Sequence, residues 1–198
     1  MSGINLFLTN LEFNWSIVES VAVLFSIIYV TLAAKQNIYC WGFAAISVIL
    51  YIYICFTAQL FAETSLQIFY LFMAAYGYYN WSKSEKKIEV IQWSASKHLI
   101  LILFGAIFTF LIGFYFTTYT SAKMPIIDSF TTVFSIIATY MTTKKVLGNW
   151  LYWIVIDLVS IYLYFSRDLH LTSLLFIMYT IIAIFGYFSW IKKVKIDA

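Results

Sequence analysis

Long apolar stretches, separated by short segments that carry most of the charge, run along the whole chain. A helix needs about 20 predominantly apolar residues to cross the roughly 30 Å hydrocarbon core of a bilayer. Seven stretches of that kind lie near residues 15–34, 40–58, 61–81, 98–118, 126–143, 148–166 and 169–190. The pattern therefore predicts an all-α membrane protein with seven transmembrane helices.

The landmarks of the first three stretches recur in the last three. When the chain is shifted by 109 positions, residues 19–83 align with residues 128–192 without a gap. The matched pairs include Phe25 with Phe134, Ser26 with Ser135, Lys35 with Lys144, Trp41 with Trp150, Tyr70 with Tyr179, Gly77 with Gly186 and Trp81 with Trp190. Duplicated units are common among small-solute transporters. We expect a first three-helix repeat at residues 15–83, a cytoplasmic loop and linker helix at 84–124, and a second repeat at 125–192.

Basic residues are distributed unevenly between the two ends of these helices. If the N-terminus lies outside, only Lys123 and Arg167 face the outside. The ten on the cytoplasmic side are then Lys35, Lys83, Lys86, Lys87, Lys97, Lys144, Lys145, Lys192, Lys193 and Lys195. This bias predicts an outer N-terminus and a cytoplasmic C-terminus. Because each repeat holds an odd number of helices, the linker helix is what lets the two repeats run parallel.

Composition supports the membrane assignment and excludes other classes. Hydrophobic residues make up 63% of the chain and charged residues only 11%, whereas about a quarter of the residues of a soluble domain are charged. The net charge of +3 lies at helix ends, where topology explains it, so we expect no nucleic-acid partner. Cys40 and Cys55 lack metal-ligand spacing and are interpreted as packing residues. Residues 1–14 contain no Lys or Arg, so no cleaved leader is expected.

The deepest acid in the chain is Asp157, at the centre of the sixth stretch. A carboxylate at that depth costs about 2.5–3.5 kcal/mol to insert, so it is expected to face a cavity and to have a function. The alternative is a structural hydrogen bond to a neighbouring Ser, Thr or Tyr. One helical face carries Asn149, Trp153, Asp157, Ser160 and Tyr164. The matching positions of the first repeat are nearly all small or apolar, namely Cys40, Ala44, Val48, Tyr51 and Cys55.

The third stretch places Glu63, Gln67 and Tyr70 on one face. Gln67 and Tyr70 approach the middle of the membrane, where an amide reads hydroxyls or another amide. We interpret Gln67 as a ligand residue, with an interhelical hydrogen bond as the alternative. Glu63 and the matched acids Glu19 and Asp128 lie in first turns, where acids favour helix starts.

Tryptophans mark both repeats. The pairs Trp41 with Trp150 and Trp81 with Trp190 lie near the predicted cytoplasmic ends, where interfacial anchoring is the first explanation. Trp153 lies one turn deeper, where an indole beside a carboxylate suits a flat cationic ring. His98 and His170 are far apart, and no phosphate loop or nucleophile elbow is present, so we expect no enzyme, no catalytic residue, no bound metal and no cofactor.

Two segments carry a resemblance to a known family. The run "LFAETSLQIFYLFMAAYGYYNW", residues 60–81, and "NWLYW", residues 149–153, resemble motifs of the PnuC family of vitamin transporters. The resemblance covers nearly the whole chain. It implies a fold similar to that of the SWEET transporters, three helices, a linker and three more. Substrate-binding positions implied by the motifs are Gln67, Asn149, Trp150 and Trp153. Some nicotinamide riboside carriers of the family have Asn at the position of Asp157.

The resemblance also implies a mechanism: a homotrimeric facilitator in the bacterial inner (plasma) membrane, without ion coupling, with a cytoplasmic kinase that traps the vitamin. We expect uptake of a vitamin B precursor, nicotinamide riboside, by alternating access, with Gln67, Tyr70, Asn149, Trp150, Trp153 and Asp157 as the substrate-binding residues. Alternatives are a thiamine carrier of the same family, a sugar carrier of the SWEET type and a non-transport assembly protein. Proton coupling through Asp157 also stays open.

Overall fold

The computed structural model describes residues 17–57, 61–83, 89–167 and 169–194. Within these ranges the chain forms seven α-helices, so the prediction of an all-helical protein is confirmed. The helices are α2 (Ile17–Ala34), α3 (Cys40–Thr57), α4 (Phe61–Ser82), α5 (Ala95–Tyr119), α6 (Pro125–Thr143), α7 (Asn149–Phe165) and α8 (His170–Ile191). Each predicted stretch lies on one of them, and the largest difference is the start of α5, at Ala95 rather than near residue 98.

Five of these helices are long and apolar enough to cross a membrane by length and composition: α2, α3, α5, α6 and the segment Thr172–Ile191 of α8. Helix α7 is apolar but only 17 residues long. Helix α4 falls outside this set, and it carries Glu63, Gln67 and several tyrosines. The two helices outside this set, α7 because it is short and α4 because it is more polar, are the ones that carry the polar side chains discussed above.

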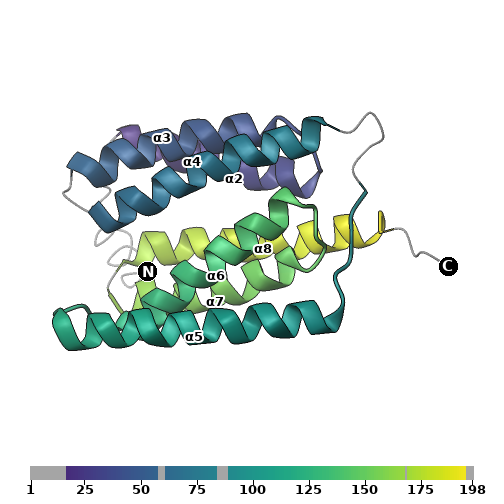
Figure 1. The fold of residues 1–198 in the computed structure, drawn as a ribbon. Coiled ribbons are helices and arrows are strands. Elements are labelled where there is room, and N and C mark those ends of the chain that lie inside the picture. The colour runs from purple at the N-terminus through teal and green to yellow at the C-terminus, as the bar shows by residue number, and fades with distance from the viewer. Residues whose placement is uncertain (1–16, 58–60, 84–88, 168, 195–198) are drawn as a thin grey trace, which may run out of the picture.

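The helices pack as two groups (Figure 1). Helix α3 contacts α2 and α4, whereas α7 contacts α6 and α8. The two groups meet through two helix pairs, α2 with α8 and α4 with α6. Helix α5 packs on α6 alone, at the edge of the second group. The space between the two groups is therefore framed by six helices, with α5 outside it.

The turns after α2 and α6 have the same conformation. Gln36 and Lys145 are left-handed, with φ of 58° and 52°. The next amide in each turn donates to the carbonyl five residues back, Asn37 N to Leu32 O at 2.9 Å and Val146 N to Met141 O at 3.0 Å. This is a Schellman ending, which usually has glycine at the left-handed position. Positions 36 and 145 are themselves separated by the 109-residue offset found in the sequence.

Each group is closely packed around one tryptophan and one glycine. A Cβ atom on Gly186 would lie 2.7 Å from the indole ring of Trp150. Gly77 stands in the same relation to Trp41. Both indoles therefore lie flat against helix backbone, and only glycine leaves room for them.

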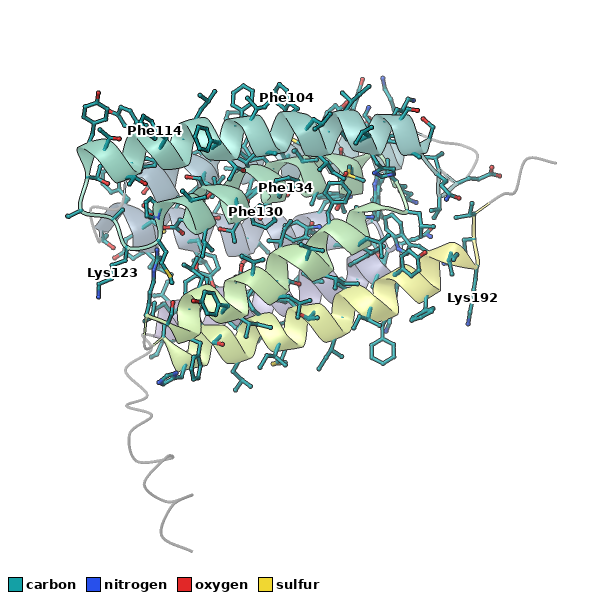
Figure 2. The ribbon with its side chains drawn as sticks, turned by 90° about the horizontal axis from the view of Figure 1, so that it is seen from below. Phe104, Phe114, Lys123, Phe130, Phe134 and Lys192 are labelled. Atoms are coloured by element: carbon teal, nitrogen blue, oxygen red, sulfur yellow. The ribbon has the colours of Figure 1, made fainter. Side chains whose placement is uncertain are left out.

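Helix α5 meets α6 through its small residues. Gly105 packs against the Phe134 ring, and Gly113 packs against the backbone of Ile126. These glycines are buried, whereas Phe104 is exposed and projects away from α6 (Figure 2). Pro125 begins α6, where its missing N–H costs no hydrogen bond.

Candidate functional site

A cavity of about 400 Å³ lies between the two helix groups. That volume is in the range of small-molecule sites, about 300–1,000 Å³. All helices except α5 contribute to its lining. Of the six residues predicted to bind substrate, the cavity brings together five: Gln67, Tyr70, Trp150, Trp153 and Asp157.

Asp157 is the most unusual group in this lining. It is only 3% exposed. Among the described residues, no side chain or backbone group forms a hydrogen bond or salt bridge with its carboxyl group. A buried carboxyl group without such a partner is costly unless a ligand or water meets it. The described residues therefore do not form the alternative considered above, a structural hydrogen bond to a neighbouring Ser, Thr or Tyr. A contact between Asp157 and substrate stays a prediction.

Gln67 and Tyr70 reach the same cavity from α4. The Gln67 amide also has no hydrogen-bond partner among the described residues, so the interhelical bond considered as an alternative is not formed there. An amide provides two donors and one acceptor oxygen. Gln67 and Asp157 thus offer complementary polar groups from the two helix groups.

Trp153 forms one aromatic wall of the cavity. Its indole Nε1 donates to the Thr142 hydroxyl at 3.4 Å, which fixes the ring orientation. Trp150 lines the cavity one turn closer to the end of the bundle where Lys35, Lys83, Lys144 and Lys192 follow their helices, which we call the lysine-rich end. The indole N–H groups of Trp150 and of its counterpart Trp41 have no partner among the described residues.

Asn149 is the one predicted site residue that the structure does not place in the lining. It is completely buried. Its Nδ2 donates to Val146 O at 2.6 Å, and its Oδ1 accepts from Thr142 Oγ1 at 3.2 Å. Since Thr142 in turn holds Trp153, Asn149 is connected to the cavity through a hydrogen-bond chain rather than by its own side chain.

Two tyrosine–serine pairs across the cavity were not predicted. The Tyr179 hydroxyl of α8 hydrogen-bonds the Ser26 hydroxyl of α2. Tyr70 of α4 and Ser135 of α6 are neighbours at the matching positions of the repeat, and both line the cavity. The sequence did contain a signal, because Ser26 aligns with Ser135 and Tyr70 aligns with Tyr179 in the repeat. Tyr179 also interacts electrostatically with Asp157.

Four tryptophans close the lysine-rich end of the cavity. The ring centroids of Trp41 and Trp81 are 5.3 Å apart, those of Trp81 and Trp190 6.2 Å, and those of Trp190 and Trp150 5.3 Å. All four side chains are buried. The expectation that these residues anchor the protein at the membrane interface is therefore wrong. The reason is that aromatic pairs of this geometry gain from stacking in the helix core.

This tryptophan cluster also joins the two helix groups by hydrogen bonds. Trp81 Nε1 of α4 donates to Thr143 O of α6 at 3.2 Å. Trp190 Nε1 of α8 donates to Ala33 O and Ala34 O of α2, at 3.1 and 3.2 Å. Both helix pairs that connect the groups thus carry one tyrosine–serine contact and one tryptophan–carbonyl contact.

Tyr164 of the Asp157 face also lines the cavity, whereas the acids of the first turns and the two cysteines do not. Glu63 is exposed in the first turn of α4, as a helix-start residue is expected to be. Asp128 lies in the first turn of α6, but it also forms a 2.9 Å salt bridge with Arg167. Cys40 and Cys55 are buried free thiols. Glu19 lies in the first turn of α2, as expected.

Comparison with known proteins gives consistent matches. A family model described as nicotinamide mononucleotide transporter matches residues 16–192. The chain is 26% identical to the nicotinamide riboside transporter PnuC of Escherichia coli K12, over 93% of this chain and 88% of the relative. It is 21% identical to the riboflavin/roseoflavin transporter RibM of Streptomyces davaonensis, over 93% of this chain and 88% of that one. A crystal structure of the vitamin B3 transporter PnuC aligns with a TM-score of 0.75 and 26% identity, covering 98% of this chain and 88% of that one.

Proposed function

The chain belongs to the nicotinamide mononucleotide transporter family, and on this premise we propose that it mediates uptake of nicotinamide riboside. It is a multi-pass membrane transporter of the PnuC family, in the bacterial inner (plasma) membrane. The observation that carries the choice of substrate is the Asp157 carboxyl group, which lines the cavity without a protein partner among the described residues. Nicotinamide riboside has a flat pyridinium ring with a positive charge, which would pair with that carboxylate.

The charge of the cavity favours the riboside over the mononucleotide. The described lining residues include one carboxyl group and no Lys or Arg. A phosphate group needs cationic or multiple N–H partners when it leaves water. A phosphorylated substrate would therefore enter this cavity at a cost that the riboside avoids.

Roles for the lining residues follow from their chemistry. Asp157 holds the positive ring or the ribose hydroxyls. The Gln67 amide bonds a polar edge of the substrate, and Trp153 with Tyr70 stacks on its ring. Trp150 offers its unpartnered indole N–H at the lysine-rich end. Asn149 acts through Thr142, by fixing the position of the Trp153 ring.

Transport by alternating access is supported by the paired contacts between the helix groups. The two groups correspond to the two repeats proposed from the sequence, in parallel orientation with the N-terminus outside. Their contacts are concentrated in two helix pairs, each with one Tyr–Ser and one Trp–carbonyl interaction. Two rigid groups joined by a few polar contacts are suited to rocking about the central cavity.

The fate of the substrate and the assembly state complete the proposal. Facilitated uptake continues only while the substrate is removed from the cytoplasm, and phosphorylation by a cytoplasmic kinase would remove it by trapping the vitamin. We expect the working unit to be a homotrimer. Thiamine remains the alternative substrate, because it also carries a flat cationic ring. Neutral riboflavin, which a relative transports, lacks the positive charge that Asp157 favours.

Uptake into proteoliposomes tests the proposal. Labelled nicotinamide riboside is offered in competition with thiamine, riboflavin or nicotinamide mononucleotide. Replacing Asp157 by Leu, which has a similar size and no polar atom, removes a contact to a charged group, which costs about 1.5–3 kcal/mol, or roughly 10- to 150-fold in affinity. Ser160→Ala serves as the control, because Ser160 is equally buried on the same helix but does not line the cavity. Parent-like uptake by Asp157→Leu would show that this carboxyl group is not part of the site. Stronger competition by thiamine than by unlabelled nicotinamide riboside would make thiamine the substrate.

A further inference from the structure

A second, separate hollow lies on the outer face of the second helix group, with a volume of about 620 Å³. Helix α5 packs on α6 and α6 packs on α7, whereas the backbones of α5 and α7 stay apart and the two helices approach each other through the His98 and Tyr152 side chains. The gap between them is a groove with α6 as its base, where Phe130 and Phe134 lie 4.6 Å apart (Figure 2). None of its lining residues lines the central cavity.

Polarity changes along this groove. The polar lining residues, Gln92, His98 and Tyr152, lie where α5 and α7 begin. The lining deeper in the groove is aliphatic and aromatic, and consists of Ile102, Phe130, Phe134, Val155 and Ile156, with Leu151 beside Tyr152 at the edge of this apolar part. Ile102 and Val155 are six or seven residues from the starts of their helices, about 9–10 Å along the helix axis. The groove is thus polar at the lysine-rich end and apolar toward the middle of the membrane.

Two lysines stand close to the mouth of the groove, although neither is among its lining residues. The Lys97 Nζ lies 5.9 Å from the Trp93 ring, which lines the mouth. Lys144 is farther away: its Nζ is 4.9 Å from the Tyr76 ring of α4 and 5.9 Å from the Tyr140 ring, which is itself 6.5 Å from the Trp93 ring. No Asp or Glu is among the described lining residues. His98 Nδ1 and the Tyr152 hydroxyl, 3.3 Å apart, add hydrogen-bonding groups at the same depth.

We propose that this groove binds one anionic phospholipid of the surrounding bilayer. One acyl chain lies on Phe130 and Phe134, between α5 and α7. The phosphate group lies at the mouth, near Lys97 and Lys144. Basic sites between transmembrane helices attract anionic headgroups, with about 1 kcal/mol from each cation near the surface. A zwitterionic lipid gains less, because its own ammonium group opposes the two lysines.

Native mass spectrometry of the delipidated protein, titrated with phosphatidylglycerol or phosphatidylethanolamine of the same acyl chains, tests this inference. The first phosphatidylglycerol is expected to bind at a lower concentration than phosphatidylethanolamine. Lys97→Gln should weaken that binding about fivefold, which corresponds to about 1 kcal/mol. Lys192→Gln is the charge control, since Lys192 follows α8, whereas Lys97 lies over the ring of Trp93, which lines the groove.

A steric pair of variants tests the acyl position. Leu151→Trp fills the groove, whereas Leu158→Trp adds the same bulk on an equally exposed part of α7 outside it, at 54% against 48% exposed. Only Leu151→Trp should abolish the first bound lipid, with the far-ultraviolet circular dichroism of both variants unchanged. Equal binding of both lipids, equal effects of the two tryptophans, or loss of oligomers instead of lipid in Leu151→Trp would each overturn the proposal. The last result would assign the groove to a second copy of the chain.

Discussion

Replacement of Gly186 by alanine tests the closest packing in the second helix group. The added Cβ atom would lie 2.7 Å from three atoms of the Trp150 ring. Carbon atoms in favourable contact are about 3.5–4.0 Å apart, so the overlap is roughly 1 Å. The ring has little freedom to move, because it meets Trp190 edge to face, at 90° and 5.3 Å, and Trp190 is completely buried.

The magnitude follows from two opposing terms. Overpacking of a rigid core costs about 1–3 kcal/mol, and the immobile indole places this site in the upper half of that range. Alanine in place of glycine in a helix returns about 1 kcal/mol. The expected net loss is therefore about 1–2 kcal/mol, a decrease in Tm of roughly 2–8 °C for a chain of this size.

Gly42 provides the matched control. No atom lies within 4 Å of a Cβ built on Gly42. Gly42→Ala should therefore gain the helix term alone and raise Tm by about 2–4 °C. The assay is thermal unfolding of both variants in the same detergent, followed by uptake measurements, where displacement of Trp150 toward the cavity should also weaken substrate binding. A Gly186→Ala protein as stable as Gly42→Ala would refute the packing argument.

Two further predictions concern charges at the two ends of the bundle. Burial lowers the pKa of Lys145 to about 8 from 10.5, with repulsion from Lys193 acting in the same direction and the Cys40 thiol opposing it. Between these pH values the unfolded chain holds the proton and the folded chain does not, so stability should rise from pH 8 to about 10.5. Lys145→Gln, which copies Gln36 at the matching left-handed position, should remove that slope in unfolding curves measured at several pH values. At the other end, Asp128→Asn should lower the free energy of unfolding by less than about 1 kcal/mol, because the side chains of Asp128 and Arg167 in their salt bridge are 46% and 23% exposed. A larger loss, measured by chemical denaturation, would show that the pair orders the start of α6.

Helix positions were predictable from sequence because each transmembrane helix satisfies its own backbone in lipid. Length and hydropathy alone therefore locate it, and the bounds found for α3 and α6 differ from the predicted ones by a single residue. The prediction that Asp157 faces a cavity agrees with its place in the lining. The side of a helix that faces a neighbour depends on packing between helices that are distant in the sequence. For that reason the sequence did not reveal that the Asn149 side chain lies behind the lining or that the four tryptophans form a buried cluster.

The tyrosine–serine contacts show that the sequence repeat carried information about contacts between distant helices, which the pattern within one helix does not carry. Ser26 and Tyr179 are 153 positions apart, and no local spacing connects them. Both, however, are conserved between the two halves of this chain, as Ser135 and Tyr70. Some residues kept in both halves, such as Trp81 and Trp190, join the helix groups, whereas residues that differ between the halves, such as Asp157 and Gln67, make the lining of the cavity asymmetric.

This division leads to a prediction about substrate orientation. Val48 and Asp157 are matching positions, and both line the cavity. The double variant Val48→Asp/Asp157→Val moves the carboxyl group to the other helix group and keeps one buried acid, so the cost of about 2.5–3.5 kcal/mol for insertion stays the same. Gln67 and Trp153 have Phe176 and Ala44 as their counterparts, so the moved carboxylate would no longer face the same amide and indole. Binding of nicotinamide riboside, measured by isothermal titration, should be as weak for the double variant as for Asp157→Val alone. Recovery of the parent affinity would mean that the substrate depends on the acid alone and that the asymmetric residues around it do not orient the ring.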